Sequence, residues 1–74
     1  MSDEELISAI RASVNHQPTN SDKIFFSSIL RELNFRYGKV NDELIEFQIR
    51  ALDAKGLLKA AYDRDGVFCG VHFW

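Results

Sequence analysis

The chain has one cysteine among its 74 residues, and this scarcity excludes two common ways of holding a small protein together. Cys69 alone cannot form an internal disulfide, and a Cys-rich zinc site needs several thiolates. The two histidines, His16 and His72, lie far apart in sequence and have no cysteine or acidic residue at ligand spacing. We therefore expect no metal and no cofactor.

Long apolar runs and catalytic motifs are missing as well. No stretch approaches the ~20 apolar residues of a membrane span, and the acidic start Met1–Glu5 does not resemble a secretory signal peptide. The sequence has no Gly-rich phosphate loop, no serine in a strand–turn–helix elbow and no plausible pair of catalytic carboxylates. We expect a cytoplasmic protein that does not cross a membrane and is not an enzyme.

The composition is that of a small globular domain covering residues 1–74, with 46% hydrophobic and 27% charged residues. The formal net charge of −2 is unevenly distributed along the chain. Residues 1–22 carry one arginine against four acids, residues 23–40 carry four bases against Glu32, and residues 41–54 carry Arg50 against four acids. Positive charge is therefore concentrated in the middle of the chain and near its end.

Two helices are expected in the first half. Ser2 and Glu5 form a capping box, and apolar residues then recur at helical spacing, which predicts a helix over about residues 3–16, ended by Pro18. The next segment, residues 23–26, is either a short strand before a helix over about 27–36 or the start of one longer helix. We favour the strand, because isoleucine and phenylalanine prefer extended structure and Ser27 is a good helix cap.

A third helix is expected over about residues 42–55, with Asn41 as its cap and Gly56 at its end. Its apolar positions cover more than half of the helix surface, which predicts a helix packed on most sides. The apolar residues are Leu44, Ile45, Phe47, Ile49, Ala51 and Leu52, and the polar Gln48 lies on the same part of the helix surface.

A β-hairpin is expected from two strands, about residues 57–63 and 67–74. Asp65-Gly66 between alternating apolar segments predicts a two-residue type I′ turn, which would pair Tyr62 with Cys69 and Ala60 with Val71. The core face would then consist of Leu58, Ala60, Tyr62, Cys69, Val71 and Phe73. The opposite face would show three large hydrophobic side chains to solvent, which indicates a protein or homodimer interface; its candidate residues are Leu57, Phe68, His72 and Trp74.

The order helix, short strand, helix, helix, hairpin resembles the winged helix-turn-helix. The resemblance covers Phe26 to Trp74 and rests on the segments ILREL, NFRYGK and IRALDAKGLL, whose Leu-x-x-x-Gly-Leu-Leu pattern is similar to the junction of third helix and wing in that family. It implies a small α+β fold with three helices and a two- or three-stranded antiparallel sheet. It also implies binding of double-stranded DNA in a small transcriptional regulator, with the third helix in the major groove. The candidate DNA-binding residues are Arg36, Lys39, Asn41, Arg50, Lys59 and Arg64.

The third helix departs from the pattern of a DNA-reading helix. Its exposed positions include three acids, Asp42, Glu43 and Glu46, and Arg50 follows Glu46 at the spacing of an intrahelical ion pair. Acidic side chains beside DNA phosphates must be offset by strong cations. The sequence therefore also supports a second interpretation, a winged helix that binds protein instead of DNA through this acidic helix or the aromatic face of the wing.

Overall fold

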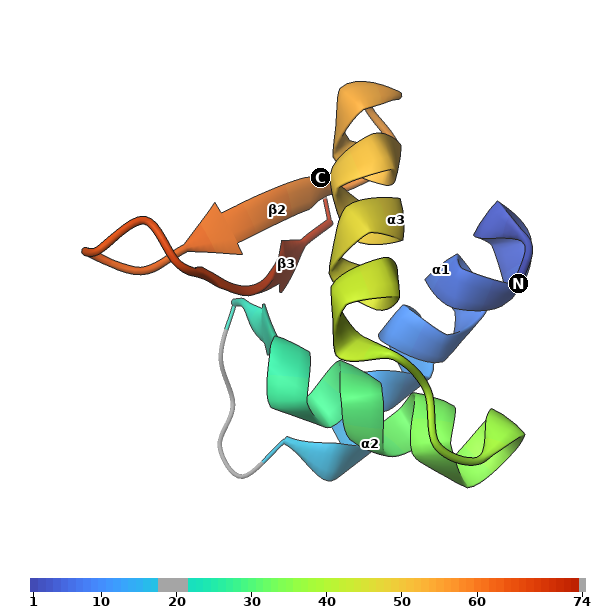
Figure 1. Cartoon of the computed structure of the whole chain (residues 1–74). Helices are drawn as coiled ribbons and strands as arrows, with labels where there is room; N and C mark the ends of the chain where they lie inside the picture. The colour runs from blue at the N-terminus through green and yellow to red at the C-terminus, as the bar shows by residue number, and fades with distance from the viewer. Residues whose placement is uncertain (18–21, 74) are drawn as a thin grey trace.

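The helices and strands follow one another along the chain in the order expected (Figure 1). The computed structural model describes residues 1–17 and 22–73. Its elements are α1 (Asp3–Ala12), a 3-10 turn η1 (Ser13–His16), β1 (Ile24–Phe25), α2 (Phe26–Tyr37), α3 (Asp42–Ala54), β2 (Lys59–Tyr62) and β3 (Phe68–His72). The strands form one antiparallel sheet in the order β1-β3-β2. Within the described residues this is the expected α+β architecture, a winged-helix-like fold, with the β2–β3 hairpin as the wing.

Two of the three N-terminal helix caps predicted from sequence are confirmed. The prediction of Ser27 as a cap is wrong, because α2 begins one residue earlier, at Phe26, and Phe25 takes the cap position without a side-chain cap hydrogen bond. The Ser2 hydroxyl accepts from the Glu5 amide at 3.1 Å while the Glu5 carboxylate accepts from the Ser2 amide at 3.0 Å. At the start of α3, the side-chain oxygen of Asn41 accepts from the Leu44 amide at 3.1 Å. Each bond satisfies a backbone donor that the first turn of a helix leaves without a partner.

Residues 23–26 contain a strand, as we favoured, and α2 begins directly after it. Ile24 pairs with Val71 and Phe25 with Gly70. The side-chain amide of Gln17 also holds this short strand, because it accepts from the Phe25 amide and donates to the Lys23 carbonyl, both at 3.0 Å. A two-residue strand is thus bonded both to β3 and to the end of the preceding helical segment.

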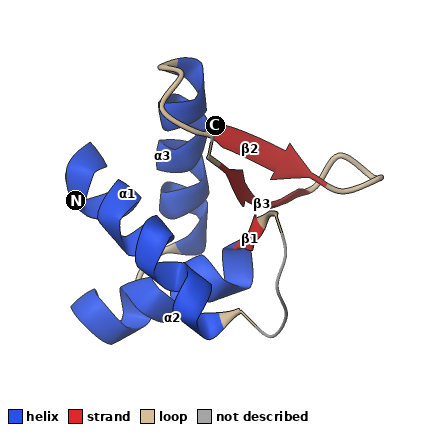
Figure 2. Cartoon of the chain, turned by 180° about the vertical axis from the view of Figure 1, so that it is seen from behind, coloured by secondary structure: helices blue, strands red, loops and turns tan. Residues whose placement is uncertain are grey.

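The hydrophobic core lies where the three helices meet the sheet. Figures 1 and 2 show the wing extending from α3 on the side opposite to α1. Every element except η1 contributes at least one buried apolar side chain. The fully buried ones are Leu6, Ala9, Ile10, Ile29, Leu33, Ile49, Leu52, Leu58 and Val71.

The junction between α3 and the wing follows from Gly56. This glycine has φ +76°, a left-handed conformation that other residues adopt at a cost. The Leu57 amide donates to the Leu52 carbonyl and the Gly56 amide to the Asp53 carbonyl, which is the Schellman arrangement of a helix end. The Asp53 carboxylate then accepts from the Ala60 amide at 3.1 Å and ties β2 to the last turn of α3.

The wing turn differs from the type I′ turn that we expected. The Asp63 carboxylate accepts from the amides of Asp65 at 2.8 Å and Val67 at 3.0 Å, and the Gly66 amide donates to the Asp63 carbonyl. Only Gly66, not Asp65, has a positive φ, of +80°. The result is a three-residue loop with a type I turn followed by a left-handed glycine, a common alternative hairpin geometry.

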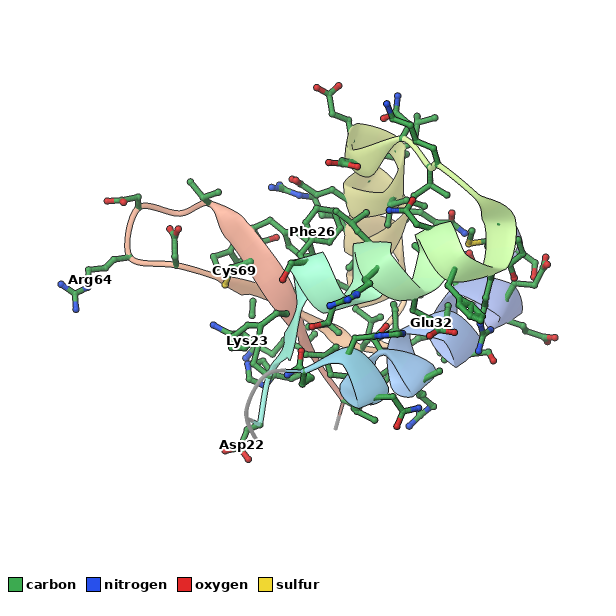
Figure 3. All side chains as sticks on the ribbon, turned by 90° about the horizontal axis from the view of Figure 1, so that it is seen from below. Asp22, Lys23, Phe26, Glu32, Arg64 and Cys69 are labelled. Carbon is green, nitrogen blue, oxygen red and sulfur yellow. The ribbon has the colours of Figure 1, made fainter. Side chains whose placement is uncertain are left out.

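This longer loop changes the outer half of the strand register. Tyr62 pairs with Phe68 and not with Cys69, whereas Ala60 still pairs with Val71 as predicted. Cys69 is the extra residue of a β-bulge that absorbs the difference. It is half-buried, with the Lys23 ammonium 3.4 Å from its sulfur (Figure 3).

Replacing Gly70 is expected to destabilise the fold by separating β1 from β3. A Cβ atom at this position would overlap the backbone carbonyl oxygen of Ile24, which cannot rotate away as a side chain could. We expect Gly70→Ala to lower the free energy of unfolding by about 3 kcal/mol, the upper range for overpacking. Gly66→Ala is the control, because a Cβ there meets nothing within 4 Å and only the backbone strain of about 1 kcal/mol applies. Urea titrations of both variants measure the difference, and equal costs would contradict the steric explanation.

Candidate interaction surface on α3

One side of α3 carries large apolar side chains that the rest of the fold does not cover. Leu44 is 67% exposed and Phe47 is 73% exposed. Our prediction that this helix is packed on most sides is therefore wrong, because the core covers only the stripe of Ile45, Ile49 and Leu52. We call the opposite stripe the outer face of α3; it consists of Leu44, Phe47, Ala51 and Ala54, with Glu43, Glu46 and Arg50 along one border.

A shallow hollow of about 290 Å³ lies on the charged border of this face, lined by Glu43, Glu46, Phe47 and Arg50. The Arg50 guanidinium donates to the Glu46 carboxylate at 2.7 Å. Its central carbon also lies 5.3 Å from the ring centre of Tyr62 on the wing. Arg50 therefore bridges α3 and β2 and is held by both contacts.

The wing adds two exposed hydrophobic side chains. Tyr62, at the end of β2, is 46% exposed, and Val67 on the other side of the turn is also exposed. Tyr62 was expected in the core, but it lies at the rim, with its ring edge-on to Phe68 at 6.2 Å. Through Arg50, the apolar outer face of α3 is thus linked to an aromatic side chain of the wing.

Two of the cations expected to bind DNA, Arg36 and Arg50, are paired with carboxylates. Arg36, in the last turn of α2, donates to the Glu32 carboxylate at 2.6 Å and lies 3.4 Å from the Ser8 hydroxyl. The Glu32 carboxylate raises the pKa of Arg36, and the hydrogen bond from Arg36, followed by that from His16, lowers the pKa of Glu32. Arg36 and Arg50 are therefore both engaged by carboxylates of their own helices.

The other DNA-binding candidates lie around α3 without forming one cluster with it. Lys39 is exposed in the turn before α3, and Asn41 is occupied as the helix cap. Lys59 begins β2 and pairs in register with His72. Arg64 projects from the tip of the wing, away from the helices (Figure 3).

The four residues expected to form a protein interface on the outer side of the wing are not all exposed. Phe68 is only 6% exposed, because the bulge at Cys69 turns it into the core, where its ring meets Phe26 edge-to-face at 4.8 Å. Leu57 is exposed as expected. His72 is half-buried and its Nδ1 donates to the Asp22 carbonyl at 3.1 Å. Trp74 lies outside the described residues. Besides Leu57, a partner could contact Leu44 and Phe47, two large hydrophobic side chains on α3 that are also exposed.

The sequence contained a signal for this face that our interpretation missed. Apolar residues covered more than half of the third helix, whereas a 74-residue protein has few elements with which to cover them. The surplus positions, Leu44 and Phe47, are three residues apart and so share one side of the helix. Such a surplus indicates an external contact surface as readily as a buried helix.

Comparisons with known proteins do not assign this surface: the chain matches no protein-family model, no curated protein and no solved structure. Among the described residues there is no group of three or more His, Cys, Asp or Glu side chains that could hold a metal ion. None of the helices in the described part of the chain is long and apolar enough to cross a membrane.

The ion pair of Glu32 with Arg36 predicts a pH dependence of the free energy of unfolding. Because the folded-state pKa of Glu32 is lowered, its ionised form stabilises the fold above the ordinary glutamate pKa of about 4.3, and this contribution is lost as the pH falls through the lowered value. We expect Glu32→Gln to reduce the free energy of unfolding at pH 7 and to have a smaller effect as the pH falls through the lowered pKa of Glu32. Urea titrations of both proteins between pH 3 and pH 7 measure this effect. A difference in unfolding free energy between Glu32→Gln and the unchanged protein that stays constant with pH would contradict the prediction.

Two substitutions on α3 test which side of the helix is covered. Phe47→Ser should change the free energy of unfolding by no more than about 0.5 kcal/mol, as exposed positions usually do. Ile49→Ala, on the fully buried side, should cost about 2–5 kcal/mol. Thermal and urea unfolding monitored by circular dichroism measure both. A loss at Phe47 as large as that at Ile49 would show that the outer face is part of the core.

Proposed function

We propose that this chain is a winged-helix protein-interaction module that binds its partner on the outer face of α3. The observation that carries the proposal is the exposure of Leu44 and Phe47 on the helix that reads DNA in other winged helices. Neighbouring large hydrophobic side chains open to water are typical of binding surfaces, because covering them is favourable.

The size of the exposed apolar group supports this proposal. Leu44 and Phe47 share one side of α3, and Tyr62 and Val67 on the wing are also exposed. An aromatic anchor surrounded by smaller apolar and polar contacts is the usual composition of an interface hot spot. Phe47, at 73% exposure, is the natural anchor on this helix.

The charges near α3 argue in the same direction. DNA has one negative charge per ~1.7 Å of helix axis, so that a surface placed against it needs unpaired cations. On α3, three exposed or half-exposed acids, Asp42, Glu43 and Glu46, stand against Arg50, which is paired with Glu46. This surface would meet phosphate with the wrong sign of charge.

DNA binding is the second candidate function, supported by two exposed cations, one in the turn before α3 and one at the tip of the wing. Arg64 projects from the tip of the wing, where it could reach a phosphate, and Lys39 precedes α3. This candidate requires that these two residues, with Lys59, outweigh the acids of α3. It predicts salt-dependent retardation of duplex DNA that is weakened by Lys39→Ala or Arg64→Ala.

Site-specific photo-crosslinking distinguishes the two functions. We expect a benzoylphenylalanine in place of Phe47 to give a discrete protein adduct of higher mass on irradiation in the cells that produce the chain. The matched control places the same group at Phe35, which is 76% exposed but lies on α2. Denaturing electrophoresis and mass spectrometry of the adduct measure the result.

Two outcomes would overturn the proposal. One is an adduct at position 47 that disappears on nuclease treatment, together with retardation of a random-sequence duplex at low salt. The other is the absence of any adduct that is specific to position 47. Resistance of the adduct to nuclease, with no retarded duplex, supports the protein-binding function.

A further inference from the structure

The charges that border the outer face of α3 restrict the chemistry of a partner that can bind there. We infer that the surface accepts a basic amphipathic helix, with apolar side chains on Leu44 and Phe47 and lysine or arginine side chains beside Glu43 and Glu46. This inference rests on the proposed function and adds the class of partner to it.

The carboxylates of α3 give this surface a negative sign. From Asp42 to Ala54 the helix carries four carboxylates and one guanidinium. Arg50, the one cation, is held by Glu46 at 2.7 Å and by the Tyr62 ring. Asp42 and Glu43 are exposed, and Glu43 lines the hollow beside Phe47. A partner that covers Phe47 therefore meets carboxylates at its edge, and cationic side chains there would be attracted while anionic ones would be repelled.

The shape of the apolar stripe favours a helix as the partner. Leu44, Phe47, Ala51 and Ala54 are spaced by three or four residues, so they form a row along α3 of about 15 Å, at 1.5 Å per residue. The small side chains of Ala51 and Ala54 permit close approach of another helix next to the two larger ones. An extended peptide would bind less well here, because α3 bonds its backbone groups internally and offers no strand edge with which the peptide could form backbone hydrogen bonds.

A second copy of the chain is less suitable as the occupant. Two outer faces packed against each other would bring together four border carboxylates, Glu43 and Glu46 of each copy, and two Arg50 guanidinium groups that are already paired within their own chains. Like charges juxtaposed in an interface oppose association. A partner of opposite sign avoids this repulsion and neutralises the acids.

Two synthetic peptides of 16 residues serve as probes. Both have the same leucines at helical spacing, and the remaining positions are all lysine in one peptide and all glutamate in the other. We expect the lysine peptide to bind the whole chain at least about tenfold more tightly than the glutamate peptide, as measured by fluorescence anisotropy at 50 mM salt. We also expect it to shift the amide resonances of residues 43–54 and of Tyr62 in the ¹⁵N-labelled protein.

Variants separate the contribution of charge from that of the apolar stripe. The double variant Glu43→Lys, Glu46→Lys should weaken binding of the lysine peptide about tenfold or more. The single charge reversal Glu4→Lys, at an exposed position of α1, should not. Leu44→Ser with Phe47→Ser should weaken binding of both peptides. Circular dichroism of each variant checks that the fold is kept.

The outcomes distinguish failure of this inference from failure of the proposed function. Binding that depends on Leu44 and Phe47 but not on the sign of the peptide charge overturns the basic-helix inference and leaves the interaction module in place. Resonance shifts confined to other surfaces, or no effect of the apolar substitutions, overturn both. Self-association that is lost with Phe47→Ser, with no binding of the lysine peptide, assigns the face to a second copy and overturns the inference.

Discussion

The left-handed glycine at the end of α3 is the constraint on which the rest of the structure depends. The left-handed conformation of Gly56 ends the helix and turns the chain toward the wing, and Leu52 before the turn and Leu58 after it are both fully buried in the core. The Asp53 carboxylate then bonds the Ala60 amide, which fixes where β2 leaves the helix. A different residue at position 56 would have to adopt a conformation that costs about 1–2 kcal/mol for any residue with a Cβ.

This junction also determines which side of α3 stays open. With the wing attached at the end of α3 and the core built on Ile45, Ile49 and Leu52, no element among the described residues covers the opposite side of the helix. The Arg50 side chain spans from Glu46 to the Tyr62 ring and so keeps the wing and the outer face in one arrangement. The surface we assign to a partner is thus a product of the fold itself, formed from rigid elements and not from a loop.

Most of the architecture could be predicted from sequence because local chemistry decides it. The capping box at Ser2, the cap at Asn41 and the helix end at Gly56 each depend on a few neighbouring residues, and the structure confirms them. The inner hairpin pair of Ala60 with Val71 was also correct. The outer pair of Tyr62 with Cys69 was wrong, because the Asp63 carboxylate accepts from the amides of Asp65 and Val67 and the loop is one residue longer than expected.

The candidate site was less predictable because it depends on contacts between distant residues. Whether Phe68 faces solvent or the core depends on one bulged residue, Cys69, which a regular alternation cannot represent. Whether Arg36 is available to a ligand depends on its side-chain geometry with Glu32 and Ser8. Likewise, the periodicity of α3 marked Leu44 and Phe47 as apolar but could not state that no element would be left to cover them.

The Gln17 side chain has a consequence beyond positioning β1. In the order β1-β3-β2, β1 lies at one edge of the sheet, and an edge strand with free backbone groups can pair with a strand of another molecule. Gln17 occupies the Phe25 amide and the Lys23 carbonyl, two of the groups that such pairing would use. A single amide side chain thereby satisfies two backbone groups that pairing of another strand with β1 would require.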